Sequence, residues 1–255
     1  MVRLSIVLTI AACGSGDDSA MPDALGGTPS IEGTPVSSFE TSTCSTSSVL
    51  ALSIQIAREV DCIMPGQLVE FVEGPAIRFA GSAVLPYLSS VAREALYAAA
   101  EAGGGNVVEV TSAFRTVVQQ YLLHRWFELG RCAITAAADP GSSNHESGRA
   151  LDVSNYNTWI TRLEAEGWSH SVPGDPVHFD HLTSPDIRGA DVLAFQRLWN
   201  RNAPDDQITE DGQYGPMTAD RVKRAPAEGF GIGALCATRL VAPAVHTATE
   251  VECAH

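Results

Sequence analysis

Helical and strand-like patterns alternate between residues 84 and 182, and this alternation constrains the fold more than any other feature of the sequence. Alanines and leucines recur at helical spacing over 84–102, and a run of three glycines ends that pattern. Residues 106–114, NVVEVTSAF, alternate and are rich in β-branched side chains, which predicts a strand. A second helix is predicted over 116–130.

The alternation continues downstream with two further strands and a short helix. ALDV at 150–153 predicts a strand, ITRLEAEG at 160–167 a short helix, and DPVHFDHL at 175–182 another strand. Upstream, the apolar spacing over 47–61 predicts one more helix. Together these elements predict an α+β fold, in which helices pack on a small, mostly antiparallel sheet.

Composition narrows the class of protein. A chain of 255 residues with 45% hydrophobic residues can bury a large core, as one domain or as a catalytic domain with a small appendage. The net charge is −14, and the 16 basic residues are scattered rather than clustered. The sequence therefore argues against nucleic-acid binding and predicts a solvated acidic surface. We also expect the protein to be a monomer.

The N-terminus, MVRLSIVLTIAACGSGDD, resembles the lipobox of bacterial lipoproteins. Arg3 precedes a short apolar run that ends in small residues and Cys13, and the run is too short to span a bilayer. This predicts a signal peptide over 1–13 and a lipid on Cys13; a plain secretory signal or a misassigned start codon are the alternatives. Residues 14–45 are rich in Gly, Ser, Thr and Pro and predict a flexible linker.

If Cys13 carries the lipid, five cysteines remain for an oxidising compartment, which predicts two disulfides and one free thiol. A helix of about 15 residues between Cys44 and Cys62 would span roughly 22 Å, too far for those two to pair. The loop-like tail at 231–255 permits a pair between Cys236 and Cys253 instead. Cys132 is the fifth of these cysteines, and the sequence does not assign it a partner.

Candidate metal ligands lie near the predicted strand ends. His145 and Asp152 stand seven positions apart in SSNHESGRALDV, and a catalytic zinc takes three protein ligands and leaves one position open. The third ligand would be either His178 or His181. Side chains alternate between the two faces of a strand, so residues three positions apart face opposite ways and only one of these histidines can join the site. Asp175, three residues before His178, is a candidate general base.

The pattern Ser143-x-His145-x-x-Gly148-x-Ala150-x-Asp152, followed by Asp175-x-x-His178, resembles the signature of the zinc D-alanyl-D-alanine carboxypeptidases. That family includes the vancomycin-resistance D,D-peptidases and related cell-wall endopeptidases. The upstream segment SAFRT, which contains Arg115 and is followed by Gln119, is similar to the family's Ser-Gly-Tyr-Arg-Ser. One departure is that Asp-Pro-Val-His stands where the family usually has Glu-Pro-Trp-His, so the acid is one methylene shorter.

The resemblance implies a catalytic domain over 46–184 and a role for each matched residue. It implies zinc ligation by His145, Asp152 and His178. It also implies that Asp175 is the general base and that Arg115 stabilises the oxyanion. Substrate contacts or orientation of the ligands would fall to Ser143 and Gln119. The alternatives are that Arg115 forms a surface ion pair and that Asp175 only begins a turn before Pro176.

The C-terminal part predicts two short helices around an Asp-Gly turn. Phe195-Gln196-Arg197 and Asp211-Gly212-x-x-Gly215-Pro216-x-Thr218 resemble the helical peptidoglycan-binding module that accompanies many cell-wall hydrolases. We therefore expect such a module over 185–230, followed by a tail over 231–255. The alternative is a structural cap on the catalytic domain.

These expectations combine into an exported zinc peptidase, lipid-anchored in the bacterial cell envelope and facing the periplasm or the cell wall. Its expected substrates are peptidoglycan stem peptides, and its expected reaction is removal of a terminal D-alanine. Two alternatives stay open: an endopeptidase with the same metal site, and a non-catalytic wall-binding lipoprotein. Spacing in the sequence does not decide between them.

Overall fold

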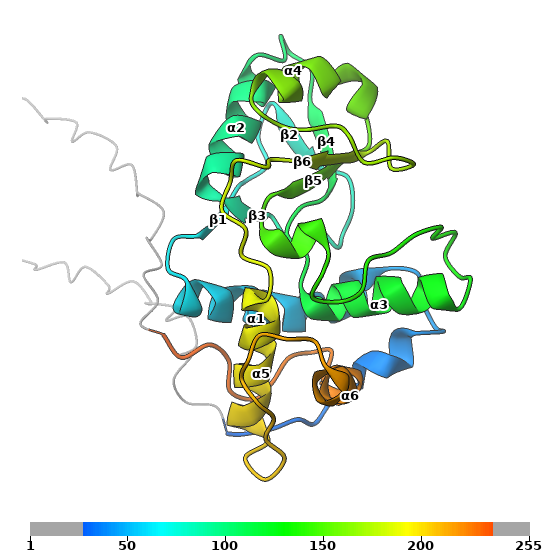
Figure 1. Ribbon diagram of the computed structural model, residues 1–255, viewed down its shortest axis with the longest axis vertical. Helices are drawn as coiled ribbons and strands as arrows, with labels where there is room; N and C mark the ends of the chain where they lie inside the picture. The colour runs from blue at the N-terminus through cyan, green and yellow to red at the C-terminus, as the bar shows by residue number, and fades with distance from the viewer. Residues whose placement is uncertain (1–27, 237–255) are drawn as a thin grey trace, which may run out of the picture.

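The computed structural model describes residues 28–236 and divides them between a sheet with two covering helices and a bundle of four helices (Figure 1). The strands are β1 (Leu68–Glu70), β2 (Ile77–Phe79), β3 (Tyr87–Ser89), β4 (Val108–Ser112), β5 (Ala150–Val153) and β6 (His178–Asp180). The α-helices are α1 (Leu50–Ile63), α2 (Ser90–Glu101), α3 (Val117–Glu128), α4 (Ile160–Ala165), α5 (Ala190–Asn202) and α6 (Pro216–Arg224). Short 3₁₀ turns are η1 (Val36–Phe39), η2 (Thr46–Val49), η3 (Asn144–Ser147) and η4 (Tyr156–Thr158).

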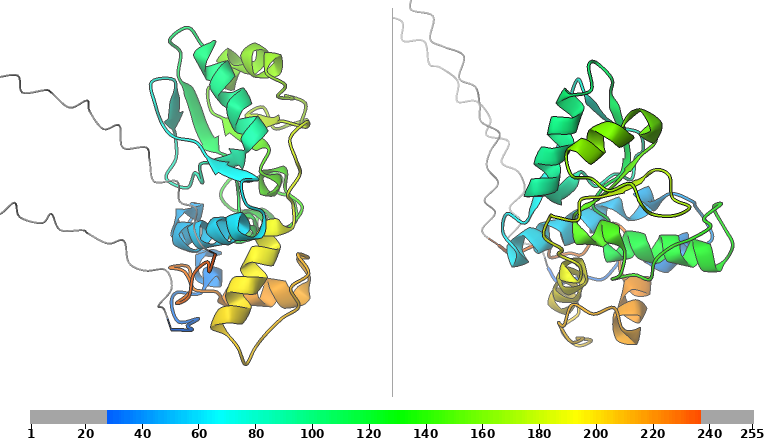
Figure 2. Two further views of the ribbon diagram at one scale, coloured as in Figure 1. Left: turned by 90° about the vertical axis from the view of Figure 1, so that its left-hand side faces the viewer. Right: turned by 45° about the horizontal axis from the view of Figure 1, so that its top comes forward.

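The main sheet has the strand order β2-β4-β5-β6, and β1 and β3 form a separate antiparallel pair. Only the β2 to β4 pairing is parallel, so the prediction of a mostly antiparallel sheet is confirmed. The helices α2 and α4 pack against this sheet (Figure 2). Alternate residues of β4 are buried, as its sequence predicts, and Val108 and Val110 join Leu151 and Trp159 in a fully buried core.

Two predicted element boundaries were wrong. The helix expected from residue 84 begins only at Ser90, because Pro86 lacks an N–H and the Ser89 side chain caps the helix by accepting from Ala92 N. The strand expected over 175–182 is reduced to β6, because Asp175 sits in a turn in which its carbonyl accepts from His178 N.

The helical part has a core of its own, shared by α1, α3, α5 and α6. Ile56 of α1, Trp126 of α3 and Trp199 of α5 are fully buried in it. An ion pair with two 3.1 Å contacts joins Glu59 of α1 to Arg201 of α5. The helices on both sides of the predicted border between the catalytic domain and the C-terminal module, at residue 185, therefore share one hydrophobic core. The apolar face of α1 packs against α5 in this core.

Residues 28–45 also pack on the helical part, which corrects the prediction that the linker extends to residue 45. Val36 is fully buried, and its N–H donates to Ala225 O at 3.0 Å. The Trp126 indole donates to Phe39 O at 3.2 Å. The predicted signal peptide, with Cys13, and the rest of the linker lie outside the described residues. Within residues 28–236, no helix has the length and apolar character needed to cross a membrane.

Two disulfides tie this fold together. Cys44 pairs with Cys132 and Cys62 with Cys236, at Cα–Cα distances of 5.4 and 5.2 Å. The prediction that Cys44 and Cys62 are not bonded to each other is confirmed. The pairing of Cys236 with Cys253 was wrong, because residues 230–232 fold back on α1 and α5 and bring Cys236 to the end of α1. Cys253 lies outside the described residues.

Candidate metal centre

Three predicted ligands come from three adjacent elements at one edge of the main sheet. Asp152 on β5 and His178 on β6 are direct partners in the antiparallel register, and His145 lies in η3, just before β5. Asp152 Oδ1 is 3.1 Å from His145 Nε2 and 3.1 Å from His178 Nδ1. The two histidine nitrogens are 3.2 Å apart. The three donor atoms thus form a nearly equilateral triangle.

A tight turn explains how residues so close in sequence face one point. Ser143 caps η3 by accepting from His145 N, and its own N–H donates to Glu146 Oε2 at 2.9 Å. Gly148 then takes a left-handed conformation with φ of 72° and reverses the chain into β5. Its carbonyl accepts from Ser89 N at 2.6 Å, which fixes the turn to the end of β3. A φ in this region favours glycine, so the residue type suits the turn.

The second nitrogen of each histidine lies close to an oxygen atom. His145 Nδ1 lies 2.7 Å from Ala113 O, and a carbonyl only accepts, so this nitrogen carries the proton. His178 Nε2 lies 3.1 Å from Asp180 Oδ1. With its proton on Nδ1, His145 presents the lone pair of Nε2 to the triangle, and a hydrogen-bond partner on the second nitrogen is common among metal-ligating histidines.

The arrangement fits a divalent metal. Nitrogen and carboxylate ligands about 2.0 Å from a tetrahedral zinc lie about 3.3 Å from each other, close to the observed triangle. His145 and His178 are buried and only 14% of the Asp152 side chain is exposed, so the three donor atoms are largely shielded from solvent. The same three residues satisfy the geometry expected of a metal-binding group.

The charged groups around the triangle keep the Asp152 carboxylate ionised. Burial acts to raise the pKa of Asp152, but His145, His178 and Arg115 together hold it well below its ordinary value. Burial acts to lower the pKa of His178, but its contacts with Asp152 and Asp180 raise it to about 9. Burial, with Arg115 nearby, lowers the pKa of His145. Asp152 therefore stays an anionic ligand at neutral pH.

Arg115 stands beside the ligands, at the junction of β4 and α3. Its Nη1 donates to Gln120 Oε1 at 3.0 Å, and its Nη2 donates to Ser112 Oγ at 3.1 Å. Nη2 also lies 3.5 Å from Asp152 Oδ2. The interpretation of Arg115 as a surface ion pair was wrong, because only 17% of its side chain is exposed and its contacts point into the site.

A cavity of about 560 Å³ opens over this site. Six of the seven predicted site residues line it, namely Arg115, Ser143, His145, Asp152, Asp175 and His178. The rest of the lining consists of Gln120, Leu123, Phe127, Ile134, Ala136, Ala137, Ala138, Ser142, Asn144 and Val172. Asp175 is half-buried there, in the turn before β6.

Gln119 is the predicted site residue that does not line the cavity. Its Oε1 accepts from Thr116 N at 3.3 Å and its Nε2 donates to Ala83 O at 3.0 Å, away from the ligands. Adjacent helix residues project about 100° apart, so Gln120 faces the cavity in its place. The sequence offers two successive glutamines, and only the helix phase relative to Arg115 distinguishes them.

Asp180 and His181 complete the comparison with the predicted site. Asp180 is not one of the three ligands: its Oδ1 lies 3.1 Å from His178 Nε2, and its Oδ2 accepts from Asn144 Nδ2 at 2.8 Å. His181 points away from the ligands, with Nδ1 2.8 Å from Ser184 Oγ and Nε2 3.1 Å from Glu166 O. The alternation expected along this strand is confirmed, and His178 is the histidine that joins the site.

Comparisons with known proteins agree with the resemblance drawn from the motifs. Residues 87–173 match the family model described as VanY, D-alanyl-D-alanine carboxypeptidase. The match includes Arg115, His145 and Asp152 and ends before Asp175 and His178. No curated protein sequence matches the chain.

Among solved structures, one similar chain is the LdcB LD-carboxypeptidase, described as revealing the molecular basis of peptidoglycan recognition. It is 19% identical and has a TM-score of 0.37. The match covers 58% of this chain and 77% of that one. A similarity of this size carries no functional conclusion by itself.

Proposed function

We propose that the protein is a zinc-dependent peptidase of peptidoglycan stem peptides, acting as a D-alanyl-D-alanine carboxypeptidase. The observation that carries this proposal is the triangle formed by His145, Asp152 and His178, which faces a cavity beside Arg115. The family-model match over 87–173 supports the class of reaction and of substrate. The zinc, when bound, supplies Lewis-acid chemistry that polarises the scissile carbonyl.

The chain's own residues perform the remaining steps. Asp175 lines the cavity, where its carboxylate accepts a proton from the attacking water and returns it to the leaving amine. The Arg115 guanidinium stabilises negative charge on the carbonyl oxygen as the tetrahedral intermediate forms. Gln120 and Ser112 hold that guanidinium in place through their hydrogen bonds. Ser143 holds η3, and thereby His145, in its orientation.

An endopeptidase is the second candidate. The cavity extends from the three donors along α3 to Phe127 and Ile134, leaving room for substrate beyond one terminal residue. A peptide with residues on both sides of the cleaved bond would use this additional length. The two candidates differ in whether a free C-terminal carboxylate next to the scissile bond is required.

The remaining parts of the proposal concern location and attachment. Two disulfides suit an oxidising compartment outside the cytoplasm, where peptidoglycan lies. A lipid on Cys13 would tether the protein to a membrane, and we propose that it acts as a monomer. At the predicted Asp-Gly turn, Gln196 Oε1 accepts from the N–H groups of Asp211 and Gly212 at 3.0 and 2.9 Å. Glycan binding at the C-terminal helices stays a prediction from the sequence, because these hydrogen bonds hold the turn itself together.

The test is cleavage of a stem peptide ending in D-alanyl-D-alanine, followed by mass spectrometry, with and without a chelator. We expect release of D-alanine, its loss on chelation and its recovery on addition of zinc. His145→Ala should lose both bound zinc and activity, whereas Asp175→Asn should keep zinc and lose turnover. His124→Ala serves as the control, because His124 lies on α3 outside the cavity lining.

The result also separates the candidates. Cleavage of a crosslinked muropeptide without release of free D-alanine would favour the endopeptidase. Stoichiometric zinc with no cleavage of either substrate would contradict both and leave the wall-binding alternative.

A further inference from the structure

We infer that His170 is a positioning residue for the proposed reaction, which fixes the loop that presents the Asp175 carboxylate to the cavity. The loop comprises residues 170–177, between α4 and β6. His170 is half-buried and does not line the cavity, so it acts through Asp175 and not on the substrate. This inference rests on the proposed peptidase function and adds a residue that lies outside the matched motifs.

The backbone of the loop restrains Asp175 only weakly. Asp175 N donates to Val172 O at 3.3 Å, and its carbonyl accepts from His178 N at 3.3 Å. Both distances exceed the usual range of about 2.7–3.2 Å for such bonds. Pro173 and Pro176 have no N–H group with which to add further backbone bonds. The position of the proposed base therefore needs another restraint.

His170 supplies this restraint from the other side of the loop. Its Nε2 lies 2.7 Å from Pro176 O, and a carbonyl only accepts, so Nε2 carries the proton and donates it to this bond. Pro176 directly follows Asp175 in the chain. The hydrogen bond from His170 thus holds the peptide group next to the proposed base, and it is shorter than either backbone bond of Asp175.

Two aromatic rings hold the imidazole of His170. The Phe179 ring of β6 stacks with it at a centroid distance of 4.7 Å and an interplanar angle of 29°. The Tyr156 ring of η4 stacks with it at 6.0 Å and 25°. Phe179 is fully buried in the core of the sheet. His170 therefore connects the loop to a rigid part of the fold.

The metal ligand next to the loop does not depend on His170. Val153 N donates to Val177 O at 2.9 Å, which joins the chain to β5 directly before His178. The sheet therefore fixes the chain from residue 177 onward. Loss of the hydrogen bond from His170 should displace Asp175 and leave the metal ligands in place.

The test separates the hydrogen bond of His170 from its ring stacking. His170→Gln keeps a donor, because the Nε2 atoms of glutamine and histidine both lie three bonds beyond Cβ. His170→Phe keeps a stacked ring and loses the donor. In stem-peptide cleavage, we expect His170→Phe to lower kcat by about tenfold or more, because a displaced base aligns poorly with the attacking water. KM should change by less than about twofold and bound zinc should stay at the parent's level. His170→Gln should retain most of the parent's kcat.

His124→Phe is the matched control, because His124 also lies beside an aromatic ring, that of Phe127 at 6.3 Å, but is outside the cavity lining. It should leave kcat unchanged. A parent-like kcat in His170→Phe would overturn the inference. So would an equal loss in His170→Gln, because the donor would then not matter, or a loss of zinc from His170→Phe.

Hydrogen exchange provides a readout that does not need turnover. The Asp175 amide should exchange faster in His170→Phe than in the parent or in His170→Gln, because the loop loses its strongest restraint. Equal exchange rates in the three proteins would overturn the inference whatever their activity. If the parent cleaves no stem peptide, the proposed function fails, and the catalytic role of the loop fails with it.

Discussion

Replacing Gly148 by alanine tests whether the turn between His145 and Asp152 builds the metal site. Gly148 has φ of 72°, where an L-residue costs about 1–2 kcal/mol relative to glycine. A Cβ there would also lie 3.3 Å from both Ile187 Cδ1 and Leu68 Cδ1, so these side chains must shift by a few tenths of an ångström. We expect a total loss of about 2–3 kcal/mol in the free energy of unfolding.

Two other glycines separate the components of this cost. Gly104 has φ of 60° and open space around its Cβ position, so Gly104→Ala should cost only the backbone part, about 1–2 kcal/mol. Gly74 has neither a positive φ nor a close neighbour, so Gly74→Ala should be nearly neutral. Thermal unfolding measures all three, because 1 kcal/mol shifts Tm by about 2–4 °C in a chain of this size.

Metal affinity provides the second readout. Moving the turn displaces His145 relative to Asp152, so Gly148→Ala should weaken zinc binding, whereas Gly104→Ala should not. Equal Tm shifts for Gly148→Ala and Gly104→Ala would refute the crowding against Ile187 and Leu68. A Tm for Gly148→Ala as high as that for Gly74→Ala would refute the backbone argument. Unchanged zinc affinity would show that the turn does not set the ligand geometry.

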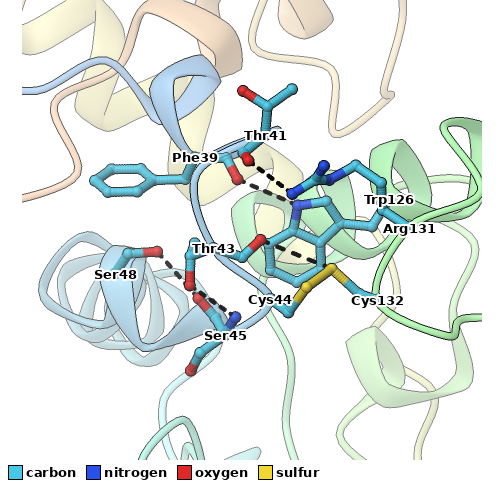
Figure 3. The surroundings of a disulfide bond; sticks show 9 residues. All are labelled: Phe39, Thr41, Thr43, Cys44, Ser45, Ser48, Trp126, Arg131 and Cys132. Carbon is cyan, nitrogen blue, oxygen red and sulfur yellow. Dashed lines mark hydrogen bonds between the residues drawn. A yellow bond between two sulfur atoms is a disulfide. The ribbon is translucent and has the colours of Figure 1, made fainter.

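Three further predictions follow from other contacts. Chelation should lower the Tm of the parent, and zinc at about 100 times its Kd should stabilise the folded protein by about 2.7 kcal/mol. His145→Ala should abolish this stabilisation. A Tm that zinc does not change would argue against the site. Replacing both Cys44 and Cys132 (Figure 3) by alanine should cost about 4–5 kcal/mol in the free energy of unfolding, because the reduced unfolded chain gains the entropy of a long open loop. Denaturant titration measures this, and a loss below about 1 kcal/mol would contradict it. Glu59→Ala should lower the free energy of unfolding by about 3 kcal/mol, because it leaves the Arg201 guanidinium without its carboxylate partner. A double-mutant cycle with Arg201→Ala should show strong coupling, and additive losses would contradict this.

Local patterns in the sequence predicted most of the sheet and the metal ligands. The alternation in NVVEVTSAF predicted β4. Strand geometry allowed only one of His178 and His181 in the site, and the resemblance to the family motif selected His178. The helix phase that places Gln120 rather than Gln119 in the cavity depends on where α3 begins, and Thr116 fixes that start by its cap. The motif alone does not specify which of two adjacent helix residues faces the cavity.

Long-range packing accounts for what the sequence did not predict. The apolar face of α1 showed that the helix must be buried, but nothing in its residues indicated that α5 would cover it. The partner of Cys236 depends on the same packing, because α1 and α5 bring residue 62 to the end of the described chain. The sequence left open whether Asp180 supports a ligand or lies at the surface, because only the fold shows that its carboxylate lies beside His178.

The two disulfides have a consequence for proteolysis, because the chain segments that they enclose overlap. One bond joins residues 44 and 132, and the other joins residues 62 and 236. A single peptide-bond cut anywhere between residues 44 and 236 therefore releases no fragment, since at least one disulfide still links the two pieces. Nicked protein should migrate as one species on a non-reducing gel and split only after reduction. An exposed enzyme built in this way keeps His145, Asp152 and His178 in one molecule after a protease has cut between them.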